Sequence, residues 1–483
     1  MINNLKPYPA MKNSGVPWLG EVPEHWEVRR LKQTFCRIIG GSTPSSTEPA
    51  FWDGDLVWVT PADISKNSRL KDSLRRITHD GLRSCSSELV PQGSLIVTSR
   101  APVGNVAIAE TDLCTNQGCK ALVASPTFVN PVFGFHVLTT LKGELQSLAT
   151  GTTFTEISTS RIGTVSFPLP PLPEQAAIVK FLDYYDRKIR RYIRAKQKLI
   201  KLLEEEKQAI IHRAVTRGLD PNVRLKPSGV EWLGDVPEHW EVVALRHRYS
   251  QCLGKMLDAK RITGRHPLPY LRNTDVQWDR INIDDLPEMD IPSNEYDRYT
   301  VQKGDLLVCE GGDVGRCAIW SSELAVCGFQ KALHRLRPRN RGRDVPRFLY
   351  YSLYAAAKSS AFNDGHLSTI AHLTGDKLKA HRFPFPPVTE QESVVDFLDN
   401  ASRQVDQTVS TAKNEINLLR EYRTRLIADV VTGKLDVREA AAKLPEEPEE
   451  PELLEEIEGT PEGEEELEGA ELDVTLEEAS IAD

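Results

Sequence analysis

The sequence predicts an α+β protein built as an internal repeat, in which two mixed α/β domains alternate with two long helices. Three observations carry this prediction. A 17-residue motif with two tryptophans occurs twice, a proline-rich block occurs twice, and each proline-rich block is followed by a long segment without proline. Because the three features come in the same order both times, the same arrangement of elements occurs twice along the chain.

The first of these features, which we name the tryptophan motif, covers residues 12–28 and 226–242, and 14 of its 17 positions are identical. Both copies contain a Pro-Glu-His-Trp step. A histidine next to a tryptophan invites a catalytic interpretation, but in a short repeated motif it more often packs or forms hydrogen bonds at a domain edge. We therefore interpret the four tryptophans as anchors that seat each domain against the helices. They are Trp18, Trp26, Trp232 and Trp240.

The proline-rich block covers residues 168–183 and 384–399, and 9 of its 16 positions are identical. Proline is excluded from helix interiors, so the block predicts an extended lead-in whose last proline, Pro173, lies in the first helical turn. In the second copy Thr389 stands at this place and is predicted to be the N-cap of the helix.

The long segments, residues 174–217 and 390–432, carry apolar residues at alternating spacings of three and four, which is typical of helices that pack along a seam. A helix of roughly 42 residues extends about 63 Å, which is too long to bury its stripe inside one domain, so each helix needs a partner helix. The predicted seam residues are Ile178, Leu182, Ile189, Leu199 and Leu203 in the first segment and Val394, Leu398, Val405, Leu419 and Leu426 in the second. A glycine, Gly218 or Gly433, is predicted to end each helix.

Charge indicates which partner each helix takes. Residues 174–217 contain 12 Lys or Arg and 6 Asp or Glu, whereas residues 390–432 contain 5 and 8. Opposite net charges favour pairing of the two helices with each other over pairing of each with a copy of itself. Solvated outer faces would give the same counts, and that alternative stays open.

The acidic residues of the chain are concentrated at its C-terminus. The chain has 60 Lys or Arg and 69 Asp or Glu, a net charge of −9, but residues 445–483 hold 18 of the acidic residues and no basic one. Residues 1–444 therefore carry 60 basic and 51 acidic residues, a net charge of +9. A basic body fits a nucleic-acid partner. The tail is predicted to be disordered, and it either competes with DNA for the body or aids solubility, the interpretation we favour.

Sequence motifs for catalysis, metal binding and membrane insertion are missing. There is no GxxxxGK[ST] phosphate loop, no GxGxxG that enters a helix and no HExxH, and none of the eight cysteines pairs as Cys-x-x-Cys. Glu205, Glu206 and Lys207 could mimic part of a nuclease metal site, but with no paired Asp nearby we interpret them as solvated charge. No apolar run reaches the roughly 18 residues that span a bilayer. We expect a cytoplasmic, non-catalytic reader with no metal and no membrane association.

The two intervening regions, residues 29–167 and 243–383, share a skeleton and differ in their surfaces. Short apolar runs bounded by Gly, Pro and Asp are predicted to be strands. They are residues 55–60, 93–98, 304–309 and 317–320. Lys120 matches Lys331 at a spacing of 211, which is also the spacing between Gly93 and Gly304 and between Gly104 and Gly315. A shared scaffold with a different surface predicts two related binding domains with different targets.

Together, the WLG-x-VP-x-HW pattern of the tryptophan motif, the divergent domain and the P-x-PP-x-x-EQ-x-x-(I/V)-V-x-FLD block before a long helix resemble the specificity subunit of a Type I restriction-modification enzyme. The resemblance covers roughly residues 12–437. It implies two target recognition domains separated by helices that form an antiparallel coiled coil, with a pseudo-two-fold internal repeat. The implied boundaries are residues 1–170 and 221–386 for the domains, 171–220 and 387–437 for the helices, and 438–483 for the acidic tail.

The resemblance also implies a function and partners. Each domain would read one half of a bipartite, asymmetric target on double-stranded DNA, and the helix length would set the unread spacer. Two methyltransferase subunits that use S-adenosylmethionine would dock on the helices, and restriction subunits would supply ATP-driven translocation and magnesium-dependent cleavage. This chain would hold no cofactor. The alternatives are a coiled-coil assembly subunit that lacks DNA readout and an undetected nuclease.

Base readout needs Arg, Lys, Asn, Gln or acidic side chains that reach the groove edges of DNA. Candidates near strand ends and glycine-rich loops are Arg100, Asn105, Asn116, Gln117 and Lys120 in the first domain, and Arg272, Asn273, Arg316, Gln330 and Lys331 in the second. The resemblance adds Thr152 and Thr153, in a Gly/Thr-rich loop. Each candidate has a simpler interpretation as a surface or turn residue. Lys120 and Lys331, at matched positions, are predicted to contact scaffold or phosphate instead of bases.

Overall fold

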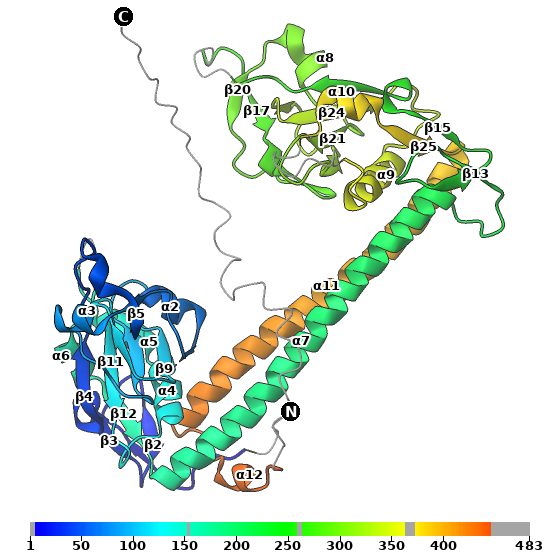
Figure 1. Cartoon of the computed structure of the whole chain (residues 1–483). Coiled ribbons are helices and arrows are strands. Elements are labelled where there is room, and N and C mark those ends of the chain that lie inside the picture. Colours follow the sequence, from blue (N-terminus) through cyan, green and yellow to red (C-terminus); the bar gives the residue numbers. More distant parts are fainter. Residues whose placement is uncertain (1–4, 152–154, 258–262, 363–371, 446–483) are drawn as a thin grey trace, which may run out of the picture. The chain divides into compact units, whose positions relative to one another are not determined.

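The computed structural model describes residues 5–151, 155–257, 263–362 and 372–445 (Figure 1). Thr152 and Thr153 lie outside the described residues. The chain forms two units, the first from residues 1–193 with 417–483 and the second from residues 194–416. Each unit contains one mixed α/β domain and a part of both long helices. None of the described helices combines the length and the hydropathy that a membrane span requires.

The long helices are α7 (Leu172–Arg217), of 46 residues, and α11 (Val388–Val431), of 44 residues. Each begins directly after a proline. The carbonyl oxygen of Pro171 or Pro387 accepts hydrogen bonds from the backbone N–H groups three and four residues further on. Thr389 therefore lies inside the first turn of α11, and its predicted role as N-cap is wrong.

The domain of the first unit is built on two sheets, of order β4-β11-β8-β9-β6 and β10-β5-β7. The pairs β6–β9 and β10–β5 are parallel and the others are antiparallel. The strands are β4 (Phe35–Gly40), β5 (Trp52–Val59), β6 (Arg69–Leu70), β7 (Arg76–Ile77), β8 (Leu95–Thr98), β9 (Val106–Ala109), β10 (Leu113–Thr115) and β11 (Cys119–Ala124). All four residues of β8 are buried, which explains its continuous apolar sequence.

The domain of the second unit repeats this plan, with sheets of order β16-β24-β21-β22 and β20-β17-β23. As in the first unit, the only parallel pair of the smaller sheet, among the described strands, joins β17 to β23. The strands are β16 (Tyr249–Leu253), β17 (Pro267–Leu271), β20 (Glu288–Asp290), β21 (Leu306–Cys309), β22 (Cys317–Ile319), β23 (Gly328–Phe329) and β24 (Leu333–Pro338). The four runs predicted as strands from the sequence are confirmed as β5, β8, β21 and β22.

The tryptophan motif and the proline-rich block of each repeat meet in the structure. Each tryptophan motif folds as a short hairpin, β1 (Met11–Asn13) with β2 (Glu21–Pro23) and β13 (Leu225–Pro227) with β14 (Asp235–Pro237). The strand after each hairpin pairs antiparallel with the lead-in of the long helix, β3 (Glu27–Arg30) with β12 (Ser166–Leu169) and β15 (Glu241–Ala244) with β25 (Arg382–Phe385). In each domain the strand that follows the hairpin is thus paired with the last strand before the long helix.

Short helices and strands complete the two units. In the first they are α1 (Leu31–Thr34), η1 (Pro49–Phe51), α2 (Pro61–Lys66), α3 (His79–Arg83), α4 (Pro131–Thr140), α5 (Lys142–Leu148), α6 (Thr159–Thr164) and α12 (Arg438–Ala442). In the second they are η2 (Leu245–His247), η4 (Asn273–Asp275), β18 (Val276–Gln277), β19 (Arg280–Ile281), η5 (Ser293–Glu295), α8 (Tyr296–Tyr299), α9 (Pro346–Lys358) and α10 (Gly375–Ala380). Phe133 of α4 and Phe348 of α9 lie in the largest cores of their units.

A partly buried histidine on α4, His136, makes the first unit sensitive to acid. Burial lowers the pKa of His136 from 6.5 to about 4, and its Nε2 has no hydrogen-bond partner among the described residues. Between these pH values the unfolded form binds more protons than the folded form, so this contribution to stability is present above pH 6.5 and is lost as the pH falls towards 4. We expect the melting temperature of the His136→Phe variant to fall less between pH 7.5 and pH 5 than that of the wild type. The exposed His79, changed to Phe, is the control, and equal falls in all three proteins would contradict the prediction.

Candidate helix clamps and nucleic-acid interface

The first tryptophan motif holds the start of α7 through one buried carboxylate. Glu174 accepts hydrogen bonds from the Tyr8 hydroxyl at 2.6 Å and the Trp26 indole at 3.0 Å, and its other oxygen lies 2.8 Å from Nε2 of His25. Trp26 is fully buried and Glu174 is 7% exposed. A carboxylate removed from water is costly unless donors surround it. We name this arrangement of His, Trp and Glu the helix clamp.

The second unit contains the same helix clamp at the start of α11. Glu390 accepts a hydrogen bond from the Trp240 indole at 3.0 Å, and its other oxygen lies 2.8 Å from Nε2 of His239. Each clamp glutamate lies in the first turn of its helix, where the helix dipole favours negative charge. The repeated Glu-His-Trp and Glu-Gln steps of the sequence are therefore two sides of one contact, and the histidines of both tryptophan motifs hydrogen-bond at a domain edge.

The glutamine after each clamp glutamate ties the helix start to its domain. Gln175 accepts a hydrogen bond from the backbone N–H of Asn130 at 2.8 Å. Its amide donates to the carbonyl oxygens of Phe128 at 2.7 Å and Pro170 at 2.8 Å. Because Asn130 also caps α4, one side chain aligns the start of α7 with the start of α4.

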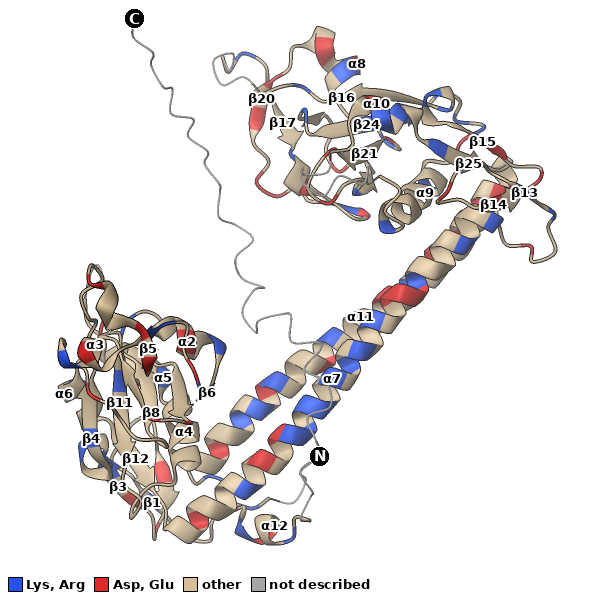
Figure 2. Cartoon of the chain, in the orientation of Figure 1, with Lys and Arg blue, Asp and Glu red and all other residues tan. Residues whose placement is uncertain are grey.

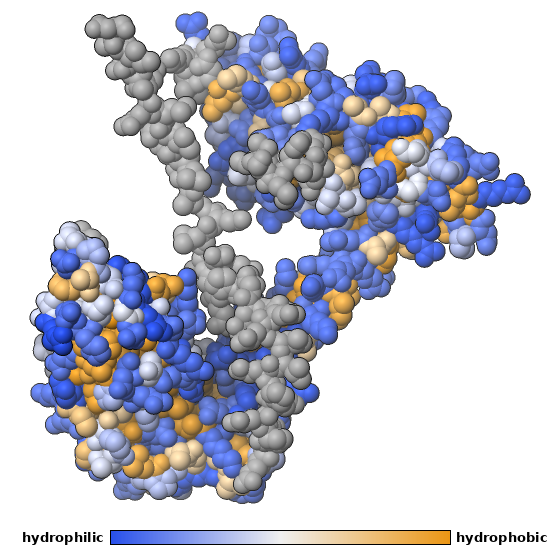
Figure 3. Space-filling view, viewed as in Figure 1, coloured by the Kyte–Doolittle hydropathy of each residue, from blue (hydrophilic) through white to orange (hydrophobic). Residues whose placement is uncertain are grey.

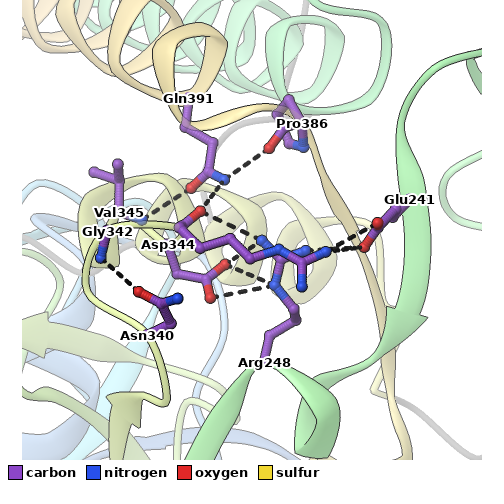
Figure 4. A network of polar contacts seen from close by, with 9 residues as sticks. Glu241, Arg248, Asn340, Gly342, Asp344, Val345, Pro386 and Gln391 are labelled. Carbon is purple, nitrogen blue, oxygen red and sulfur yellow. Dashed lines mark hydrogen bonds and ion pairs between the residues drawn. The ribbon is translucent and has the colours of Figure 1, made fainter.

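In the second unit this contact belongs to a larger polar network (Figure 4). Gln391 accepts a hydrogen bond from the backbone N–H of Val345, which precedes α9, at 2.9 Å. The guanidinium of the buried Arg248 donates to Asp344 at 2.9 Å and to Glu241 at 3.0 Å. The start of α11, the start of α9 and strand β15 are thus held by one connected set of polar side chains, which favours a single orientation of the domain on the helix start.

Each tryptophan motif also contacts the end of the other long helix. Gly433 follows α11 with a φ of +78°, and a Cβ built on it would lie 2.3 Å from Cδ of Pro23 and 3.1 Å from the Trp26 ring. Gly218 follows α7 with a φ of +72°, and a Cβ there would lie 3.2 Å from the Trp240 ring. The predicted glycine stops are confirmed. In both units, one tryptophan motif holds the start of one helix and the end of the other.

Contacts between the helices are present in each unit. Ion pairs between the helices include Asp186 with Arg423 in the first unit, and Lys196 with Glu415 at 2.6 Å and Lys207 with Asp406 at 2.7 Å in the second. Residues of both charge signs occur along both helices (Figure 2). In the second unit, the ion-pair partner on α11 has a lower residue number where the partner on α7 has a higher one. The helix segments of this unit therefore run antiparallel.

The predicted seam residues are mostly buried at the helix ends and partly buried between them. Ile178, Leu182, Ile189, Val394, Leu398 and Leu426 are buried, and Leu203, Val405 and Leu419 are intermediate. Leu199 differs from the prediction: its side chain is 39% exposed, and Ile200 is the less exposed neighbour. The reason is that a 3.6-residue helix drifts against a 3.5-residue repeat. Leu199 and Leu202 belong to the exposed apolar surface of α7; apolar side chains also show on the helix surface in Figure 3.

Two candidate DNA-contact residues of the first domain, Arg100 and Lys120, lie next to Glu156, which was not predicted from the sequence. Arg100 donates to Glu156 at 3.0 Å, and Nζ of Lys120 lies 3.9 Å from the other Glu156 oxygen and donates to the carbonyl of Gln117 at 3.2 Å. Arg100 is exposed, whereas Lys120 is buried, and burial lowers the pKa of Lys120. Asn116 accepts a hydrogen bond from the backbone N–H of Gly118 and is a turn residue.

Asn105 lies apart from this group. Its backbone N–H donates to the Thr98 hydroxyl at 2.9 Å, within the turn between β8 and β9. The exposed Gln117 accepts a hydrogen bond from the Thr43 hydroxyl at 2.5 Å, which joins the turn before β11 to the loop after β4. Gln117 therefore extends the polar edge around Glu156, and Asn105 does not.

The candidates of the second domain fall into two places. Arg272 donates through two guanidinium nitrogens to the buried Asp275, at 3.0 and 2.8 Å, and Arg316 donates to the carbonyl of Asn273 at 2.9 Å. These three candidates thus engage the chain around η4. Gln330 and Lys331 lie in the turn before β24, and the Lys331 side chain is exposed.

The match between Lys120 and Lys331 is wrong. Lys120 lies inside β11 opposite Val97, and the residue in its place on β24 is His334, which lies opposite Val308. Three residues, 110–112, separate the end of β9 from the start of β10. The matching loop of the second domain, residues 321–326, has six residues. The spacing between the repeats therefore changes from 211 to 214 within the domain.

Glu156 and His372 could have been found from the sequence. The proline-rich blocks repeat at a spacing of 216, and extending that spacing backwards pairs Glu156 with His372. Among the residues that the structure describes, no group of three His, Cys, Asp or Glu side chains is arranged to hold a metal ion.

Comparison with known proteins identifies the family. The family model described as the Type I restriction modification DNA specificity domain matches residues 23–202 and 255–418, which is more than half of the chain. The chain belongs to this family. The two matched segments and the mixed α/β content of both units confirm the repeat of mixed domains expected for a Type I specificity subunit.

The relatives include specificity subunits from Methanocaldococcus jannaschii. The Type I restriction enzyme MjaIX specificity subunit is 34% identical over 171 residues, 35% of this chain and 39% of that protein, so this alignment spans well under half of the relative. The MjaVIII specificity subunit is 21% identical over 426 residues, 86% of this chain and 94% of that protein.

A solved structure shares the fold of this chain. One chain from work on complex assembly and conformational transition of the type I R-M system superposes with a TM-score of 0.66 at 19% identity, covering 86% of this chain and 99% of that chain. At this identity the similarity establishes the fold alone.

Proposed function

We propose that this chain is the non-catalytic specificity subunit of a Type I restriction-modification complex, and that each domain reads one half of a bipartite, asymmetric target on double-stranded DNA. The observation that carries the proposal is the helix clamp, which is built twice from the same residues on two domains whose polar surfaces differ. A DNA-binding protein with two copies of one scaffold and two different surfaces can bind two different half-sites in related orientations. The basic body of the chain, with a net charge of +9 over residues 1–444, supplies the attraction to phosphates.

The long helices set the distance between the half-sites. We propose that α7 and α11 pair along their length as an antiparallel coiled coil with pseudo-two-fold symmetry. The clamps support this, because in each unit one tryptophan motif joins the start of one helix to the end of the other. The domain boundaries follow from the same proposal: residues 1–170 and 221–386 for the domains, 171–220 and 387–437 for the helices, and 438–483 for the tail.

Chemistry belongs to the partners in this proposal. Two methyltransferase subunits with S-adenosylmethionine dock on the helix surface, and restriction subunits with ATP and magnesium join them. The exposed apolar side chains of α7, such as Leu202, which is 52% exposed, give this surface the character of a docking face.

The test is a methylation map. We expect that the chain, expressed with its cognate methyltransferase subunit in a host without DNA methylation, directs methylation of adenine in both halves of one split motif. A chain that only assembles the complex, the alternative function, would give an assembled and active methyltransferase without any new motif. The purified chain with magnesium alone should leave DNA intact, and cleavage would support the nuclease alternative.

A further inference from the structure

Backbone hydrogen bonds allow the two domains to be matched residue by residue at one edge. The N–H of Asn116 donates to the carbonyl of Val59 at 2.9 Å, and the N–H of Gln330 donates to the carbonyl of Leu271 at 3.0 Å. Both acceptors are the last residues of the strands that pair in parallel with β10 and β23. Asn116 and Gln330 therefore occupy one place in the common frame, and Gln117 and Lys331 occupy the next.

A second pair of hydrogen bonds matches the other side of this edge. The N–H of Ile157 donates to the carbonyl of Ser99 at 2.9 Å, and the N–H of Leu373 donates to the carbonyl of Glu310 at 2.7 Å. The residues next to these bonds are matched as well: Arg100 with Gly311, and Glu156 with His372. With Lys120 matched to His334 by strand register, the edge has five matched positions, and all five residues differ.

In the first domain this edge is a small ionic cluster. Glu156 lies between Arg100 and Lys120, and the side chains of Glu156 and Arg100 are 37% and 45% exposed. An ion pair this exposed contributes little to stability, so folding alone does not require it. Its carboxylate and guanidinium have the chemistry that distinguishes base edges in the major groove of DNA.

In the second domain the described residues of this edge form no ionic cluster. Gly311 replaces the arginine, and a Cβ there would lie 3.2 Å from Nδ1 of the exposed His372. His334 is fully buried, and its Nε2 lies 3.0 Å from the carbonyl oxygen of Leu373. The exposed polar side chains at this edge are thus Lys331 and His372, in place of Arg100, Gln117 and the partly exposed Glu156.

We propose that this edge carries the base-reading side chains of each domain: Arg100 and Glu156, with Lys120 as a positioning residue, in the first, and Lys331 and His372 in the second. The inference rests on the proposed function and names the residues that would recognise the DNA sequence. A guanidinium donates to O6 and N7 of guanine, and a carboxylate accepts from N4 of cytosine. The first half-site therefore contains a G·C pair that is read by Arg100 and Glu156. Arg272 and Arg316, engaged within the chain around η4, are left out of the readout.

The test measures base preference in the complex of this chain with its cognate methyltransferase subunit. DNA libraries carry the methylated motif with each position randomised in turn, and the preference at each position is taken from the bound and unbound pools. We expect Arg100→Lys and Glu156→Ala each to lower the preference for one G·C pair of one half-site by about 10- to 100-fold, with the other half unchanged. His372→Ala should change only the other half. Arg83→Ala, in an exposed ion pair of the first domain, is the control.

Two results would overturn the inference. Uniform weakening across all sequences would make Arg100 a phosphate contact, because phosphate contacts carry no sequence information. Unchanged preference in both first-domain variants, at wild-type melting temperature, would place the readout elsewhere. If one of the two variants fails to fold, the other still tests the inference, because Arg100→Lys and Glu156→Ala change opposite charges of the same cluster. A wild-type complex without any motif would overturn the proposed function as well, whereas a motif that both variants preserve overturns this inference alone.

Discussion

Replacing Glu174 with alanine should destabilise the first unit by about 3 kcal/mol or more, because it leaves two buried donors, the Trp26 indole and the Tyr8 hydroxyl, without an acceptor at about 1–3 kcal/mol each. The clamp glutamate of the second unit is the matched comparison. The Glu390 side chain is 29% exposed and has one indole donor, so Glu390→Ala should cost less. Glu174→Gln keeps an acceptor and should fall between the wild type and Glu174→Ala.

The loss can be measured by hydrogen–deuterium exchange of peptides that cover the start of each long helix. Glu174→Ala should speed exchange in residues 172–185 and leave residues 388–400 as in the wild type, and Glu390→Ala should do the reverse. Wild-type exchange at the start of α7 in the Glu174→Ala variant would show that the clamp does not hold the helix.

The second large effect is expected at the end of α11. A methyl group on Gly433 would lie 2.3 Å from Cδ of Pro23, a rigid ring, at a φ of +78°. Gly15 has a similar φ of +71° and nothing within 4 Å of the same methyl group. Gly15→Ala should therefore cost about 1 kcal/mol for the left-handed backbone alone, whereas Gly433→Ala should cost that amount and in addition about 1–3 kcal/mol for overpacking.

Urea unfolding of the two variants separates these contributions. The midpoint for Gly433→Ala should fall clearly below that for Gly15→Ala at an unchanged slope. Equal midpoints would mean that Pro23 moves aside without cost and that the first tryptophan motif does not fix the helix end.

The repeat, the strands and the long helices could be predicted because they depend on local patterns. Gly218 and Gly433 mark helix ends through backbone conformation, and the apolar run of β8 follows from burial on both faces. The clamp was only half predictable. The repeated His-Trp and Glu-Gln steps were visible, but only the paired strands β3 and β12 bring residues 25 and 174 together.

Each failure of the sequence-based predictions has a physical cause. The pairing of Lys120 with Lys331 failed because a longer surface loop shifts the register, and loop length is weakly constrained by stability. Thr389 is not a cap because Pro387 already accepts the first helical hydrogen bonds. Leu199 lies outside the buried seam because the 3.6-residue turn of a long helix drifts against a 3.5-residue repeat. Glu156 was missed because base readout was sought at strand ends, while this residue reaches the edge from the segment before α6.

The most direct test of the central claim exchanges one domain for a copy of the other. Two matched backbone hydrogen bonds define the ends of the exchanged segments: the N–H of Leu31 donates to the carbonyl of Val165, and the N–H of Leu245 donates to the carbonyl of His381. An exchange at these residues leaves both clamps and the strands β3, β12, β15 and β25 intact. We predict that a chain with residues 31–165 in place of 245–381 directs methylation of a motif whose two halves are inverted copies of one half of the wild-type motif, with the spacer unchanged. An assembled, active complex that still methylates the asymmetric wild-type motif would contradict the account.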